Sequence, residues 1–98
     1  MTLEEFRGLA GGRPPPGISG ALLALHHDAR GDWEAAHQSA QAVDTPDGAW
    51  VHAYLHRKEG DAGNAGYWYR RAGRRVPACS LESEWEQIAC ELLKAEKA

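Results

Sequence analysis

Apolar residues recur every three or four positions along most of the chain, the spacing that places side chains on one face of a helix. From residue 19 onward this spacing continues almost without interruption. Two of the resulting apolar stripes are Ile18, Leu22, Leu25 and Ala29, and Leu81, Trp85, Ile88 and Leu92. Because no segment alternates apolar and polar residues as a half-buried strand does, the pattern predicts an all-α protein without strands.

Residues that typically begin and end helices divide this pattern into segments. Gly31 and Gly60 occupy positions where a helix ends, and each is followed by an aspartate, a favoured cap of the next helix. Thr45 and Pro46 supply a further cap and a first-turn proline. We therefore expect five main helices, joined by connections short enough to make neighbouring helices antiparallel. Their expected ranges are 19–30, 32–43, 46–59, 61–73 and 80–96.

The first 17 residues differ from the rest of the chain. Thr2 and Glu5 match the capping box of a short helix, which would bring the total to six. Residues 11–17, Gly-Gly-Arg-Pro-Pro-Pro-Gly, do not suit regular structure. We expect residues 1–17 to form an N-terminal lead-in with a short helix and a Gly/Pro-rich strap, which either packs on the domain or extends away from it. Residues 18–98 are expected to form a single all-helical domain.

The four tryptophans are evenly spaced. They are separated by 17, 18 and 17 residues, so that each of the last four expected helices carries one, and alternate tryptophans lie 35 apart. They are Trp33, Trp50, Trp68 and Trp85. A period of this length is typical of a helix-turn-helix repeat unit. We expect each tryptophan to serve as a large core residue of its helix.

A second sign of repetition lies in residues 60–72, Gly-Asp-Ala-Gly-Asn-Ala-Gly-Tyr-Trp-Tyr-Arg-Arg-Ala, followed by Pro77. This stretch resembles the second helix of a tetratricopeptide repeat, including its Sel-like relatives, and the likeness extends over about residues 20–77. The resemblance implies a tetratricopeptide-like superhelix or bundle of antiparallel pairs, a fold that commonly serves as a binding surface. The whole chain also resembles a group of short bacterial proteins of unknown role, which implies no activity.

Composition and charge exclude several classes of function. A chain of 98 residues with 43% hydrophobic and 26% charged residues is typical of one soluble domain. A net charge of −3 argues against non-specific binding to nucleic acid or anionic lipid. No apolar run approaches the ~20 residues of a membrane span, and the first residues do not resemble a signal peptide. Because two cysteines make no disulfide framework, we expect a cytoplasmic location.

Basic residues are concentrated in one part of the chain. Residues 49–77 carry six basic and two acidic side chains, whereas both flanking segments are acidic. Arginines beside exposed aromatic residues are common at the energetic centres of protein interfaces. We expect a non-enzymatic interaction module that binds a protein or peptide, or a second copy of the chain, unless the arginines pair with acidic neighbours. The candidate protein-binding residues are Tyr67, Arg70, Arg71 and Arg74.

Histidines suggest an alternative function, a metal- or small-ligand-binding protein. His52, His56 and Glu59 share one face of an expected helix, from which they could supply metal ligands. The glutamate that follows the first histidine in zinc-protease helices is absent. A generic site would need a further ligand, for which His26 and Asp28 are candidates. Spacing alone does not fix ligand geometry, so we prefer hydrogen-bonded imidazoles on a half-buried face and expect no metal and no cofactor.

Patterns typical of catalysis are missing. The serines do not occur in a nucleophile elbow. Cys79 and Cys90 are eleven residues apart, which fits neither a redox pair nor a zinc knuckle. We therefore assign no catalytic residue and do not expect an enzyme.

Overall fold

Six helices and no strand make up residues 1–97, the part of the chain that the computed structural model describes, and side chains are described to residue 95. The helices are α1 (Leu3–Gly8), α2 (Gly20–Ala29), α3 (Trp33–Gln41), α4 (Pro46–Glu59), α5 (Ala62–Arg71) and α6 (Leu81–Lys97). The prediction of an all-α fold is confirmed, and each helix lies within a few residues of its expected range. Residue 98 of the expected domain lies outside the described residues. None of the helices within residues 1–97 has the length and apolar character needed to cross a membrane.

Two tight turns form the helix hairpins. Gly31 and Gly60 have φ angles of 81° and 88°, a left-handed conformation that glycine adopts without strain. The side chains of Asp32 and Asp61 follow directly and accept hydrogen bonds from backbone N–H groups of α3 and α5. Each glycine-aspartate pair therefore ends one helix and begins the next, which pairs α2 with α3 and α4 with α5.

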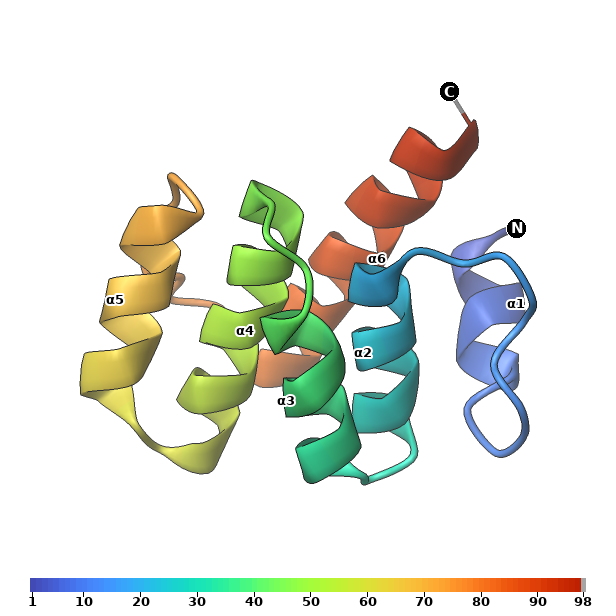
Figure 1. The fold of residues 1–98 in the computed structure, drawn as a ribbon, viewed down its shortest axis with the longest axis horizontal. Helices are drawn as coiled ribbons and strands as arrows, with labels where there is room; N and C mark the ends of the chain where they lie inside the picture. The colour runs from blue at the N-terminus through green and yellow to red at the C-terminus, as the bar shows by residue number, and fades with distance from the viewer. Residues whose placement is uncertain (98) are drawn as a thin grey trace.

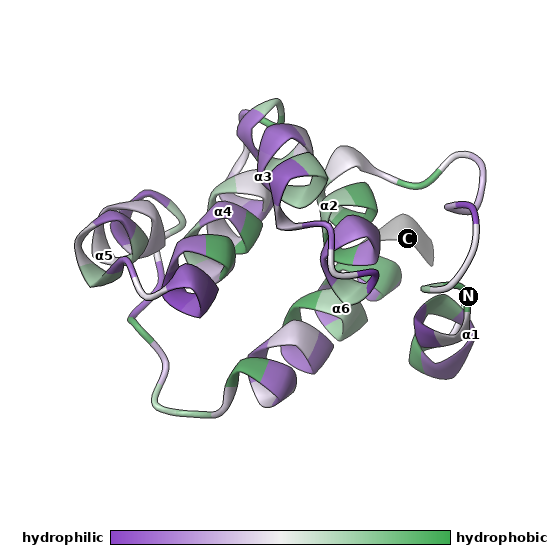
Figure 2. Ribbon diagram, turned by 90° about the horizontal axis from the view of Figure 1, so that it is seen from below, coloured by the Kyte–Doolittle hydropathy of each residue, from purple (hydrophilic) through white to green (hydrophobic). Residues whose placement is uncertain are grey.

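Helices α2 to α5 lie in a row, with α5 at one end and α1 beyond the other (Figure 1). Helix α6 runs behind the row and packs against α2 and α4, so that hydrophobic stretches of α2 and α6 adjoin each other (Figure 2). This is where the core lies. Its fully buried aliphatic side chains include Leu22, Leu25, Val51, Leu55 and Ile88. Burial of such side chains contributes roughly 1.5–3 kcal/mol each, which makes this layer the main source of stability.

The N-terminal lead-in packs on the domain. Phe6 of α1 is 1% exposed and stacks on Trp85 of α6, with ring centroids 5.7 Å apart. The Gly-rich turn is held by His26, whose Nε2 lies 3.0 Å from the carbonyl oxygen of Gly12. Of the two arrangements considered for residues 1–17, the structure has the packed one.

The tryptophans divide into two kinds. As predicted, α3, α4, α5 and α6 carry one each. Trp50 and Trp85 are buried, at 4% and 7% exposure, whereas Trp33 and Trp68 are only partly buried against the core. The expectation of one core residue per helix therefore fits Trp50 and Trp85 fully. Trp33 and Trp68 instead lie beside a group of polar side chains.

A buried carboxylate joins three helices. Glu84 of α6 is 1% exposed and accepts hydrogen bonds from Tyr69 of α5, at 2.6 and 2.8 Å, and from the indole N–H of Trp50 in α4, at 3.2 Å. Arg57 of α4 pairs with the same carboxylate at 2.8 Å. Since a buried charge is tolerated only when it is paired and hydrogen-bonded, these partners explain how an acidic residue can lie in the core.

Candidate metal centre

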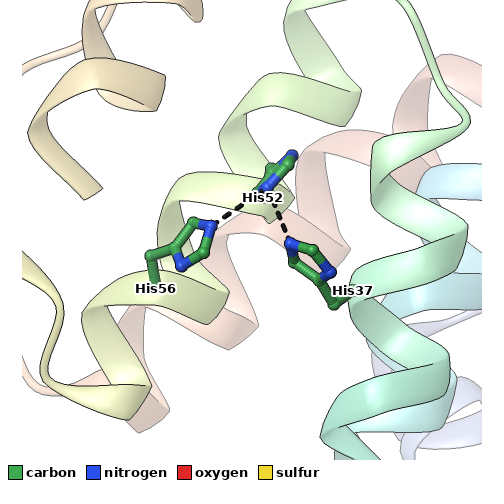
Figure 3. A group of neighbouring side chains, drawn as sticks. All are labelled: His37, His52 and His56. Atoms are coloured by element: carbon green, nitrogen blue, oxygen red, sulfur yellow. Dashed lines mark hydrogen bonds between the residues drawn. The ribbon is translucent and has the colours of Figure 1, made fainter. Parts of the chain in front are cut away.

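Three histidines converge between α3 and α4. His37 comes from α3, and His52 and His56 lie one turn apart on α4 (Figure 3). The Nε2 atom of His52 is 3.0 Å from Nε2 of His37 and 3.1 Å from Nε2 of His56. One nitrogen of each ring lies within 4.8 Å of those of the other two. The three rings therefore present their Nε2 atoms to a common point.

The α3–α4 hairpin brings these residues together. Histidines four residues apart on α4 share one helix face. The short connection between α3 and α4 then turns His37 toward that face, and it does so by a close approach of Gly48 to Val43. A Cβ atom added at Gly48 would lie 2.3 Å from the carbonyl oxygen of Val43, so this approach requires glycine.

The two short contacts at His52 are not explained by hydrogen bonds alone. A neutral imidazole nitrogen carries either one proton or one lone pair, so each ring nitrogen makes one good hydrogen bond. Nε2 of His52 nevertheless lies at hydrogen-bonding distance from two nitrogens, one on His37 and one on His56. A cation at the common point would satisfy all three lone pairs at once, which a proton cannot do.

Two tryptophans fix the orientation of the imidazoles. Trp33 stacks on His37 with a centroid separation of 4.9 Å and an interplanar angle of 9°. Trp68 stacks on His52 at 3.9 Å and 14°. Trp33 is itself held by a 2.9 Å hydrogen bond from its indole N–H to the carbonyl oxygen of Leu55. The rings of the cluster are thus set by packing, which lowers the ordering cost of binding a ligand.

Glu59 acts on the cluster from its outer side. Its carboxylate lies 2.6 Å from Nδ1 of His56 and accepts a hydrogen bond from that nitrogen. With the proton on Nδ1, the lone pair of His56 is on Nε2, the atom that faces His52. Metal-binding histidines are commonly oriented by a carboxylate in this way, and the contact increases their basicity.

Burial lowers the pKa of two imidazoles of the cluster. His52 is 4% exposed, and burial, reinforced by the neighbouring His37 and His56, lowers its pKa to about 4. Burial, together with the proximity of His56, also lowers the pKa of His37. Both rings are therefore uncharged at pH 7. A neutral ring with a free lone pair is the state in which histidine binds a metal.

The distances suit one first-row transition-metal ion. Imidazole nitrogens bind Zn²⁺ at about 2.0–2.1 Å, which places two tetrahedral ligand nitrogens roughly 3.3 Å apart. The separations at His52, 3.0 and 3.1 Å, need to increase by only a few tenths of an ångström. Three imidazole ligands favour zinc, copper, nickel or cobalt over magnesium or calcium, which prefer oxygen ligands.

The structure brings together His52, His56 and Glu59, as their spacing on the helix suggested. The suggested further ligands lie elsewhere: His26 contacts Gly12, and Asp28 accepts hydrogen bonds from Tyr54 and Lys58. The third histidine of the cluster is His37, which was not among the expected ligands. Positions 37 and 52 lie almost symmetrically about the α3–α4 connection. In an antiparallel helix pair, such positions lie side by side, and this spacing could have predicted the contact between His37 and His52.

The candidate protein-binding residues are only partly free to meet a partner. They lie on α5 or directly after it: Tyr67, Arg70, Arg71 and Arg74. Tyr67 is 44% exposed, and Arg70 is also exposed. The guanidinium of Arg71 lies 5.1 Å from the ring centroid of Trp68. Arg74 lies over Trp50 and pairs with Glu91 at 3.0 Å. Arg71 also donates a 3.1 Å hydrogen bond to the hydroxyl of Tyr67, so three of these four side chains already have partners within the chain.

Comparison of the chain with models of known protein families, with curated protein sequences and with solved structures found no match. A function for this protein is therefore inferred from the geometry of the histidine cluster.

Proposed function

We propose that this protein binds one Zn²⁺ ion, or a similar late first-row divalent cation, through Nε2 of His37, His52 and His56. The observation that carries the proposal is the double contact at His52, whose Nε2 lies 3.0 and 3.1 Å from the other two nitrogens. Three lone pairs directed at one point are a ligand set for a metal.

The surroundings of the cluster favour binding. Stacking by Trp33 and Trp68 holds two rings in place before any ion arrives. Glu59 adds a negative charge next to His56, which offsets part of the charge of a divalent cation. The bound ion would join α3 to α4 and stabilise the folded chain, because the unfolded chain does not hold the three rings together.

Calorimetric titration of the metal-free protein with Zn²⁺ at pH 7 tests the proposal. We expect one equivalent to bind, and the single substitutions His37→Ala, His52→Ala and His56→Ala each to weaken binding by more than about 100-fold, since each removes a ligand. His27→Ala is the matched control, because His27 lies on α2 outside the cluster. No heat with the wild type, or equal affinity in His37→Ala, would contradict a three-histidine site.

A second candidate function is protein binding at the end of the helix row. Helix α5 packs along α4 at the end of the row, and its buried Tyr69 also reaches Glu84 of α6. Tyr67 and Arg70 lie on the exposed outer face of α5. The side-by-side hairpins α2–α3 and α4–α5 favour tetratricopeptide-like packing, in which a further segment would extend the row here. We propose an acidic protein or peptide as the partner, with the acidic ends of a second copy as one example. A cytoplasmic protein would keep its two cysteines free, as they are here.

Sedimentation at low and high salt tests self-association on this face. We expect a dimer at low salt that dissociates at high salt, because the attraction is between charges and salt screens it. The double substitution Tyr67→Ala and Arg70→Ala should leave the chain monomeric at low salt. A wild-type monomer at both salt concentrations would exclude the dimer.

A further inference from the structure

The histidine cluster contains fewer protein ligands than zinc requires. Within residues 1–95, no fourth ligand atom of a histidine, cysteine, aspartate or glutamate joins the group formed by His37, His52 and His56. Structural zinc sites have four protein ligands, whereas sites with three protein ligands complete their coordination with water or a substrate. The number of ligands therefore distinguishes an open site from a closed one.

The nearest carboxylates do not supply the missing ligand. Glu59 is bound to Nδ1 of His56, at the opposite end of the imidazole ring from Nε2. Glu59 and Asp61 form a separate group with His56, and neither is within reach of all three Nε2 atoms. Asp61 is further engaged as the cap of α5, where it accepts hydrogen bonds from Asn64. The fourth ligand of the metal therefore has to come from outside this group of side chains.

The shape of the site limits what can bind there. His37 is partly exposed, whereas His52 and His56 are buried, so the cluster meets solvent on the side of α3. Trp33 stacks on His37 and also meets His56 edge-on, with centroids 6.1 Å apart. Trp33 therefore forms a flat aromatic wall beside the cluster, and this wall offers few polar contacts to a large ligand.

We propose that the metal bound by these three histidines keeps one coordination position open, occupied by water or hydroxide and exchangeable for a small monoanion. This inference rests on the metal site proposed above. Because an imidazole ligand brings no negative charge, unlike a thiolate or a carboxylate, an anionic fourth ligand is attracted by the full charge of the divalent cation. Glu59 and Asp61 beside the site disfavour multiply charged anions such as phosphate.

Cobalt substitution and azide test the open position. The metal-free protein is loaded with one equivalent of Co²⁺, whose visible d–d absorption reports the number and kind of its ligands. We expect Co²⁺ bands to appear on loading and to shift saturably on addition of azide, with the cobalt still bound after gel filtration. The same titration of His52→Ala, as the control, should give neither the bands nor the shift.

The outcomes separate this inference from the metal site itself. Cobalt bands that azide does not alter at saturating concentration would mean a closed site, which overturns the open position and leaves metal binding intact. Removal of the cobalt by azide would also overturn it. If no cobalt bands form at all, both the metal site and the open position are wrong. A further test concerns the size of the ligand. If Trp33 keeps larger ligands from the metal, free imidazole should bind the cobalt of Trp33→Ala but not that of the wild type. The same response to imidazole in both proteins would contradict the role of Trp33 as an aromatic wall.

Discussion

The Nε2 atom of His52 lies within 3.1 Å of two other imidazole nitrogens in a region that excludes most solvent. Grouping neutral imidazoles in this way stabilises the chain little, because each ring loses water and gains at most one good hydrogen bond. A cation bound at the common point turns the same arrangement into a favourable one. At the scale of the residue, the cluster is therefore better explained by a ligand than by folding.

Glu59 offers a residue-scale test of how the site is supported. Glu59→Gln keeps the size of the side chain but removes the charge that His56 Nδ1 contacts, so we expect metal affinity to fall about 10–100-fold, as for other second-layer carboxylates. Competition with a chromophoric chelator measures the affinity. Asp61→Asn is the matched control, since asparagine also caps a helix well. Equal losses of metal affinity in the two variants would mean that the metal site depends on the whole group formed by His56, Glu59 and Asp61, and not on the contact between Glu59 and His56 alone.

Two buried tyrosines lead to a prediction at alkaline pH. Burial, with Asp28 next to Tyr54 and Glu84 next to Tyr69, raises the pKa of both phenols well above its usual range. The unfolded chain loses these protons near pH ~10 while the folded chain keeps them, so stability is complete below that pH and falls as the pH rises above it. Tyrosinate absorbance should therefore be the same in wild type and Tyr54→Phe until the chain unfolds. A smaller signal in the folded Tyr54→Phe variant would show that Tyr54 ionises in the native state.

At the scale of the element, the α3–α4 hairpin decides whether the site exists. His37 reaches His52 only because α3 and α4 approach closely at Val43 and Gly48. The contacts within α4 are local, since they follow from a four-residue spacing, but the contact between His37 and α4 depends on the turn. The connection between the two helices thus positions His37 for the proposed metal site.

Gly48→Ala tests this role. The added methyl group would lie 2.3 Å from the Val43 carbonyl oxygen, so the turn has to shift. We expect a loss of about 1–3 kcal/mol in unfolding free energy, typical of overpacking, and weaker Zn²⁺ binding. Gly63→Ala is the control, because a Cβ there meets nothing closer than 3.9 Å and alanine favours a helix. Unchanged stability and affinity in Gly48→Ala, measured by urea unfolding and calorimetry, would contradict the role of this turn.

Glu84 connects elements that are distant in sequence. Glu84→Ala removes the carboxylate that Arg57, Trp50 and Tyr69 contact and leaves Arg57 without its buried partner. We expect a loss of about 3–5 kcal/mol in unfolding free energy, the usual cost of breaking a buried ion pair. Glu82→Ala, an exposed change on the same helix, should stay within about 0.5 kcal/mol. Similar urea midpoints for the two variants would show that Glu84 is not a structural centre.

These elements also show how far sequence reasoning reaches. The helix ranges followed from local signals, such as the aspartates at positions 32 and 61, because a cap acts on the first turn of its own helix. The grouping of His52, His56 and Glu59 was predictable for the same reason. His37 was missed because its partners lie across a turn, and the burial of Glu84 depends on the packing of three helices. The local spacing of residues within a single helix carries no information about the position of His37 relative to α4 or about the burial of Glu84.

At the scale of the whole molecule, the helix row separates two candidate surfaces. The histidine cluster lies inside the row, between α3 and α4, whereas Tyr67 and Arg70 lie on α5 at its end (Figure 1). Helix α6 packs against α2 and α4 and contacts α1, and neither α1 nor α6 contributes a residue to the histidine cluster. A metal ion would therefore tie the middle of the row together without occupying the end where a partner would bind.

Crystallography of the zinc-loaded protein, with anomalous differences collected at the zinc absorption edge, tests the central claim most directly. We expect one strong peak per chain, about 2.0–2.1 Å from Nε2 of His37, His52 and His56. A peak at any other group of residues, or full zinc loading of the crystal with no peak between α3 and α4, would contradict the three-histidine metal site.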